Sequence, residues 1–196
     1  MPLHVPAAPA AATRSVLAAL ASANATRGTR TPPAIRTAAG ALRPELPLPV
    51  HVLTGVAGAQ VTPRTSPTGW RFLLRGTGAA VGTADAMLTA DGWTFSHFGE
   101  GPYVASTEKA LRRASALSGA FQPRLLSVPE LYMLTLWLHS GSEQQGEEAA
   151  LDGADLLIPL APAPPGIAAD RPHRADALLP LLSRRLVPAP LLTTPA

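Results

Sequence analysis

Residues 70–98, WRFLLRGTGAAVGTADAMLTADGWTFSHF, decide the fold that we expect for this chain of 196 residues. Trp70, Phe72 and Leu74 share one face of a strand at 70–75, because alternate side chains of a strand point the same way. Asp91-Gly92 is typical of a tight hairpin turn and leads into a strand at 93–98. Residues 81–88 alternate as in a strand, although their alanine content also allows a helix. The stretch predicts an antiparallel sheet.

A helix is expected directly after this stretch. Pro102 suits the first position of a helix, and Val104, Leu111, Ala114 and Leu117 form one apolar stripe. Gly76 to Gly82 spells G-x-G-x-x-x-G, but neither the helix nor the acidic residue of a dinucleotide site follows at the required place. We interpret these glycines as a turn between strands.

Residues 121–138 are the most apolar part of the chain and allow two interpretations. One is a pair of strands at 124–128 and 131–139, joined at Pro129-Glu130. The other is a helix that begins at Ser127, with Glu130 completing a capping box. We favour strands because a polar loop at 141–153 is followed by a returning strand at 155–160. A last helix is expected over 174–186, interrupted near Pro180.

The two ends of the chain are expected to be disordered. Eight prolines within residues 1–49 interrupt helices and strands, and the one short helical stretch, 15–25, has few large apolar side chains. Residues 187–196 contain three more prolines and should fray. We therefore predict a disordered Ala/Pro/Arg-rich segment at 1–45 and one α+β domain at 46–186. This domain should hold a small antiparallel or mixed sheet with one or two packed helices.

The charge of the chain is concentrated in the N-terminal segment. Residues 1–44 contain five arginines and no acidic residue, a net charge of +5, whereas residues 45–196 have a net charge of −2. A nucleic-acid-binding domain needs clustered cations to displace counterions from phosphates, so we expect no nucleic-acid partner. The arginines instead become candidate partner-binding residues: Arg14, Arg27, Arg30, Arg36 and Arg43.

The N-terminal segment has three interpretations. Its Arg, Ser and Ala content without acids resembles an organellar targeting peptide, and Ala23-Asn24-Ala25 fits the cleavage site of an exported protein. The third interpretation is an arm that orders on a partner. We expect a cytoplasmic protein, with an organellar or exported one as the alternative. The alanine and arginine usage suggests a GC-rich, bacterial genome, and no apolar run is long enough for a transmembrane helix.

Several kinds of chemistry are excluded or unsupported. The chain has no cysteine, which excludes disulfides, thiolate metal sites and cysteine nucleophiles. Its five histidines show no metal-binding spacing, so we expect neither a metal nor a cofactor. The acidic residues at 143–155 do not follow the spacing of a calcium loop.

The residues around 96–104 are the best candidates for a small-molecule site. His97 could act as a general base and Glu100 could orient it. Ser96 should not pair with His97, because adjacent residues on a strand face opposite ways. Glu100 could also stabilise the start of the helix at Pro102, where the amides of Tyr103 and Val104 could bind an anion.

We therefore carry two hypotheses on function. The favoured one is a non-catalytic binding, accessory or assembly module whose basic N-terminal arm docks on a protein partner or on a second copy of the chain. The alternative is a small enzyme or ligand-binding protein with a pocket around Ser96–Pro102 and His97 as its base. An exposed apolar patch at 131–138 would favour the first, and a pocket holding His97 and Glu100 would favour the second.

Overall fold

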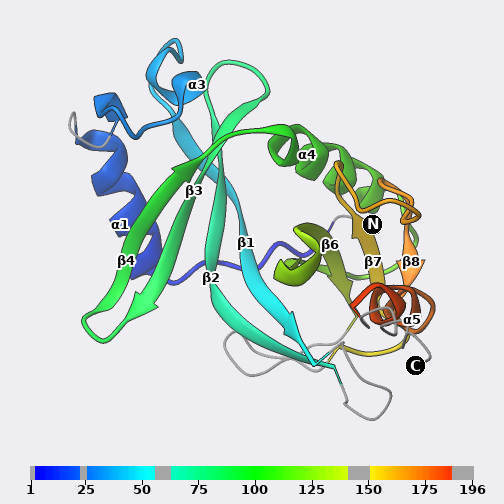
Figure 1. Ribbon diagram of the computed structural model, residues 1–196. Helices are drawn as coiled ribbons and strands as arrows, with labels where there is room; N and C mark the ends of the chain where they lie inside the picture. Colours follow the sequence, from blue (N-terminus) through cyan, green and yellow to red (C-terminus); the bar gives the residue numbers. More distant parts are fainter. Residues whose placement is uncertain (1–2, 23–25, 56–62, 141–150, 187–196) are drawn as a thin grey trace, which may run out of the picture.

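One mixed sheet of eight strands forms the centre of the molecule, with helices packed on both faces (Figure 1). The structure is a computed structural model and describes residues 3–22, 26–55, 63–140 and 151–186. The α+β class is confirmed, and the sheet is larger than the small one expected from the sequence. The predicted frayed end at 187–196 lies outside the described residues.

The elements follow one another in an order that repeats. The strands are β1 (Arg43–Thr54), β2 (Arg64–Arg75), β3 (Ala80–Thr89), β4 (Gly92–Gly99), β5 (Gln122–Val128), β6 (Met133–His139), β7 (Leu156–Pro159) and β8 (His173–Arg174). The helices are α1 (Ala10–Ala21), α3 (Pro33–Arg36), α4 (Pro102–Ser115) and α5 (Ala175–Leu186), with a 3-10 turn at Pro129–Leu131. Four strands and a helix thus occur twice, although the sequence shows no repeat.

The two halves of the sheet meet through a parallel pair. The strand order is β4-β3-β2-β1-β5-β6-β7-β8, and every neighbouring pair is antiparallel except β1 and β5. Only three residues of β1, at 50–52, pair with β5. The outermost strands are β4, with eight residues, and β8, with two.

Strands β1 and β2 begin earlier than the prolines in their sequences suggest. Strand β1 starts at Arg43, within the segment expected to be disordered, and includes Pro44, Pro47 and Pro49. These prolines are tolerated because this half of β1 pairs with β2 alone, and a bulge next to Leu46 shifts the register. The first half of β2 likewise contains a proline, Pro67.

The remaining elements agree closely with their sequence patterns. Residues 80–89 form a strand, and the apolar region 121–138 forms the two strands that we favoured over a helix. In α4, Val104, Leu111 and Ala114 are buried as the stripe predicts. The last helix was expected to be interrupted near Pro180, but α5 continues through it.

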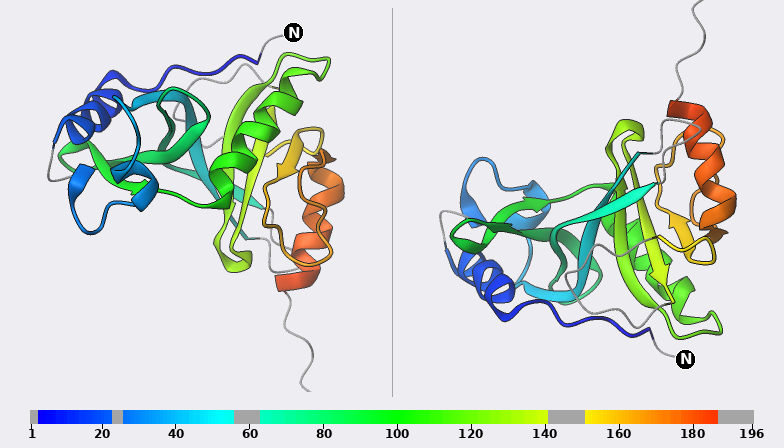
Figure 2. Two further views of the ribbon diagram at one scale, coloured as in Figure 1. Left: turned by 90° about the horizontal axis from the view of Figure 1, so that it is seen from above. Right: turned by 90° about the horizontal axis from the view of Figure 1, so that it is seen from below.

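Part of the N-terminal segment expected to be disordered is folded onto the sheet. Helix α1 buries Ala12, Val16 and Ala19, and α3 buries Ile35. Their neighbours in this core are residues of β2 and β3, including Trp70. The residues before α1 cross from Phe121, whose carbonyl accepts a hydrogen bond from the amide of His4 at 3.0 Å, to the opposite half (Figure 2).

Helices α4 and α5 cover opposite faces of the second half of the sheet. The α4 side chains pack on Leu134, Leu136 and Leu138 of β6, whereas α5 packs on the face of Met133 and Trp137. The α4 core also contains Leu48 of β1 and Leu73 of β2, so it joins the two halves.

Candidate functional site

The five arginines of the N-terminal segment all lie exposed on the surface. Arg14 is on α1, Arg36 on α3 and Arg43 at the start of β1, while Arg27 and Arg30 lie between the two helices. Among the described residues, no ion pair or side-chain hydrogen bond involves any of them. Their positive charges are therefore not neutralised by a neighbour within that part of the chain.

Two of these arginines line a cleft of about 430 Å³ beside α1, called the first cleft below. Arg27 and Arg36 flank a floor of aliphatic side chains, and Leu17 is 48% exposed there. No acidic residue lines the cleft, whose residues are Leu17, Leu20, Ala21, Thr26, Arg27, Ile35, Arg36, Ala38, Gly40, Ala41 and Leu42. The site therefore combines an apolar floor with positive charge.

A second cleft of about 500 Å³ lies beside β4. One wall is residues 28–31, which include Arg30, and the other is residues 95–98 of β4. The hydroxyl of Ser96 and the imidazole of His97 are its polar groups on the β4 side. Phe95 and Phe98 contribute aromatic surface, with ring centroids 4.6 Å apart. The second cleft contains His97, as the alternative hypothesis requires, but Glu100 does not line it.

Ser96 and His97 are brought together by a bulge that the sequence analysis did not foresee. The register shifts between Asp85 and Ala86 of β3, which leaves Ser96 as the extra residue of β4. A bulge breaks the alternation of side chains. Ser96 Oγ consequently lies 3.1 Å from His97 Nδ1, contrary to the expectation that the two face opposite ways. His97 Nε2 lies 3.7 Å from Asp85, whose carboxylate is also held by Arg71.

The Glu100 side chain contacts the N-terminal segment. Its Oε2 accepts a hydrogen bond from the amide of Ala34 at 3.2 Å, at the start of α3. Helix α4 begins instead at Pro102 behind Gly101, with no acidic residue in its first turn. The one side-chain hydrogen bond shown for Glu100 thus goes to an element from the beginning of the chain, and stabilisation of α4 by its charge stays a prediction.

Binding of an anion by the amides of Tyr103 and Val104, at the start of α4, remains a prediction. The Val104 amide donates to the Gly101 carbonyl at 3.1 Å, within the first turn. The Tyr103 hydroxyl donates to the carbonyls of Tyr132 and Pro162, at 2.7 and 3.2 Å. These bonds tie α4 to two loops of the second half.

The apolar residues 131–138 do not form an exposed patch. All residues of β6 are buried, from Met133 to His139. In the turn before β6, Leu131 is partly buried and Tyr132 is 90% exposed. The exposed apolar patch that would have favoured the binding module is therefore not found at 131–138, and β6 belongs to the interior of the second half.

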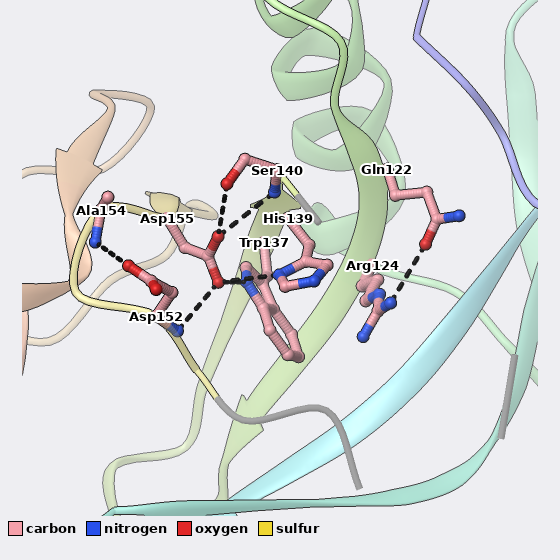
Figure 3. Close-up of polar contacts among 8 residues, drawn as sticks. All are labelled: Gln122, Arg124, Trp137, His139, Ser140, Asp152, Ala154 and Asp155. Carbon is pink, nitrogen blue, oxygen red and sulfur yellow. Dashed lines mark hydrogen bonds and ion pairs between the residues drawn. The ribbon is translucent and has the colours of Figure 1, made fainter. Parts of the chain in front are cut away.

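A buried polar cluster at the end of β6 was missed by the sequence analysis (Figure 3). Asp155 is fully buried, and its Oδ2 accepts hydrogen bonds from Trp137 Nε1 at 2.8 Å and from the Asp152 amide at 3.1 Å. His139 Nδ1 lies 3.0 Å from the same oxygen, and the Ser140 amide donates to Oδ1 at 3.3 Å. A carboxylate with this many donors joins β6 to the turn before β7.

The cluster continues across the sheet to β1. His51 of β1 packs edge-on against Trp137 with ring centroids 5.3 Å apart, and the Arg124 guanidinium lies 5.0 Å from the Trp137 ring. Burial is the main cause that lowers the pKa of His51 to about 4, and the charge of Arg124 adds to it. His51 is therefore neutral at neutral pH. The sequence signal for this cluster was His139 at the end of β6 and Asp155 just before β7, the neighbouring strand.

This cluster has the character of a structural connection. Trp137 and Asp155 are fully buried and His139 is 5% exposed, and none of the three lines the first or the second cleft. No group of three or more His, Cys, Asp or Glu side chains suitable for a metal occurs within the described ranges. Of the predicted acidic loop, Glu143, Glu147 and Glu148 lie outside the described residues.

Comparisons with known proteins add no relative. The chain matches no family model, no curated protein and no solved structure. In the part of the chain that the structure describes, no helix combines the length and the apolar character needed to cross a membrane.

Proposed function

We propose that this protein is a non-catalytic binding module that recognises an acidic segment of a protein partner. The binding surface is formed by Arg27, Arg30 and Arg36 together with the first and second clefts, and is called the arginine surface below. This proposal keeps the partner-docking role expected for the N-terminal segment. It replaces an arm that orders on binding with a surface that is already in place.

The first cleft supports this proposal. Its floor offers Leu17 and Leu20 to an apolar side chain, while Arg27 and Arg36 offer guanidinium groups to carboxylates. Guanidinium groups bind carboxylates with two parallel hydrogen bonds, which gives geometric selectivity. A partner that carries both acidic and apolar residues would satisfy both parts of the site.

Of the two functional hypotheses, the geometry of the site supports binding better than catalysis. The chain separates the two residues that were expected to act together, since His97 lines the second cleft and Glu100 binds Ala34. His97 is also 60% exposed, whereas a general base works best where water is excluded. A binding role gives the arginines a function, whereas the catalytic hypothesis gives them none.

A peptide titration tests the proposal. The probe is Ac-Thr-Glu-Val-Asp-Val-Glu-Thr-NH2, and its control is the same peptide with lysine at each acidic position. We expect the acidic peptide, but not the lysine peptide, to shift the amide resonances of residues 26–42. Reversing Arg27 and Arg36 to Glu should weaken its binding about tenfold, because two exposed pairs of about 0.2–1 kcal/mol each become repulsive.

A matched variant controls for net charge. Arg112→Glu with Arg184→Glu makes the same change in charge on the exposed faces of α4 and α5. This control should keep at least half of the wild-type affinity at 150 mM salt. Equal binding of the acidic and basic peptides, or equal loss in the two double variants, would refute a role for the arginine surface.

A further inference from the structure

Strand β4 ends the sheet on the side of the arginine surface. It has eight residues and pairs with β3, whereas the opposite edge, β8, has only two residues (Figure 1). Among the described residues, no backbone hydrogen bond other than those to β3 involves residues 92–99. One row of its amides and carbonyls therefore has no partner in that part of the chain.

The hairpin fixes which of these backbone groups point outward. Thr89 pairs with Gly92 across a two-residue turn, and Met87 pairs with Thr94. In such a hairpin the residues that flank the turn bond to each other, and bonded and outward-pointing residues then alternate. The amides and carbonyls of Trp93 and Phe95 consequently point away from β3. Beyond Phe95 the bulge at Ser96 interrupts this row.

The sequence of the edge strand lacks the residues that commonly block strand addition, although α1 packs against Trp93 and Phe95 of β4. Natural edge strands are protected by proline, by lysine or other charges, by bulges, or by a covering helix or loop. Residues 92–99, GWTFSHFG, contain no proline and no lysine, arginine or acid, and their bulge comes only after Phe95. The second cleft runs beside 95–98, with Arg30 in its opposite wall.

We propose that β4 accepts the acidic segment of the partner in extended form, as a ninth strand of the sheet. The main chain of the segment would bond to Trp93 and Phe95, and a carboxylate would bind Arg30 across the second cleft. This inference rests on the proposed function and adds the conformation of the ligand. Strand addition gives affinity through the main chain and selectivity through alternate side chains.

Charge favours an acidic segment over a second copy of the chain at this edge. Two copies paired through β4 would be related by a two-fold axis, so each would bring its own Arg30 to the interface. Neither wall of the second cleft supplies an acidic residue to pair with the incoming arginine. An acidic segment, in contrast, brings carboxylates that can pair with Arg30.

Amide protection in the intact protein tests the inference. The probe is the acidic heptapeptide described above, and the control is the same peptide N-methylated at its three central residues, which cannot pair as a strand. We expect the acidic peptide to slow hydrogen exchange of the Trp93 and Phe95 amides at least tenfold and that of Thr94 little. N-methylation should weaken binding at least tenfold.

Two further measurements keep the outcomes distinct. Trp93→Pro should weaken binding at least fivefold relative to Trp93→Ala, since both remove the indole but only proline removes the outward amide. Binding that depends on Arg27 and Arg36 without protection of Trp93 and Phe95 overturns strand addition and leaves the proposed function standing. If neither the acidic heptapeptide nor its N-methylated form binds, both the strand addition and the proposed function are overturned. Protection that grows with protein concentration without peptide would show that a second copy occupies the edge.

Discussion

At the scale of single residues, the burial of His51 makes the stability of the fold depend on pH. The imidazole is 4% exposed, packs against Trp137 and has a pKa of about 4 in the folded chain, against 6.5 without burial. Its Nδ1 has no hydrogen-bond partner among the described residues. Arg124 and His139 are the charged or titratable neighbours that oppose its protonation.

We predict that acid destabilises the protein through this residue. Between pH 6.5 and about 4 the unfolded chain binds the proton of His51 more readily than the folded chain, so stability falls as pH falls. The full window corresponds to about 3 kcal/mol, and no effect of His51 is expected above pH 7. Urea unfolding at pH 7.5 and pH 4.5 measures the difference.

The His51→Gln variant isolates this contribution. Glutamine does not titrate, so the free energy of unfolding of the variant should fall by about 2 kcal/mol less than that of the wild type between the two pH values. Parallel losses in the wild type and in the variant would show that other groups cause the acid sensitivity.

At the scale of elements, the close contact between β2 and β3 depends on a glycine. A Cβ added to Gly69 would lie 2.3 Å from the backbone oxygen of Ala86, a distance that no side chain can relieve by moving. We predict that Gly69→Ala destabilises the protein by about 2 kcal/mol or more, because the two strands must separate. Thermal unfolding monitored by circular dichroism gives the value.

A second glycine serves as the control. Gly78 lies in the turn before β3, and a Cβ there would have no heavy atom within 4 Å. Gly78→Ala should therefore change stability by less than about 0.5 kcal/mol. If both variants unfold at the same temperature, the contact at Gly69 is not the determinant that the structure indicates.

The elements also show how well side-chain alternation and proline positions predict the strands. The alternation of Trp70, Phe72 and Leu74 correctly predicted one buried face of β2, and Leu73 is buried on the other face. The polar loop and returning strand after 138 correctly favoured a strand for β6. Proline counting failed in β1, because pairing on one side only leaves room for residues without an amide hydrogen. Whether a strand is paired on one side or both is decided by residues far away in the sequence.

The candidate sites depended on the same distant information. His97 was found because it is a titratable residue next to aromatic residues, and it does line a cleft. The bulge that brings Ser96 to it arises from a one-residue mismatch with β3, which the sequence of β4 alone does not reveal. The cluster around Asp155 requires the register of β6 and the turn before β7, so it too was missed.

At the scale of the whole molecule, the N-terminal segment joins the fold and contains the arginines of the proposed binding surface. It crosses from Phe121 to the first half of the sheet, where α1 and α3 cover Trp70, Phe72 and Leu74. The segment was expected to be disordered because of its prolines and because its helical stretch has few large apolar side chains. Small residues are nevertheless suited to a helix that approaches a sheet closely, and Ala12 and Val16 are fully buried.

Adjacent residues of α1 test whether this packing holds the molecule together. Val16 is fully buried, whereas Leu17 is 48% exposed in the first cleft. Val16→Asp should lower the free energy of unfolding by about 3 kcal/mol or more, because an unpaired carboxylate would enter an apolar core. Leu17→Asp, a change of the same kind one residue away, should cost less than about 1 kcal/mol but weaken binding of the acidic peptide. Equal stability of the two variants would mean that α1 does not pack on the sheet, and the arginine surface would lose the element that positions it.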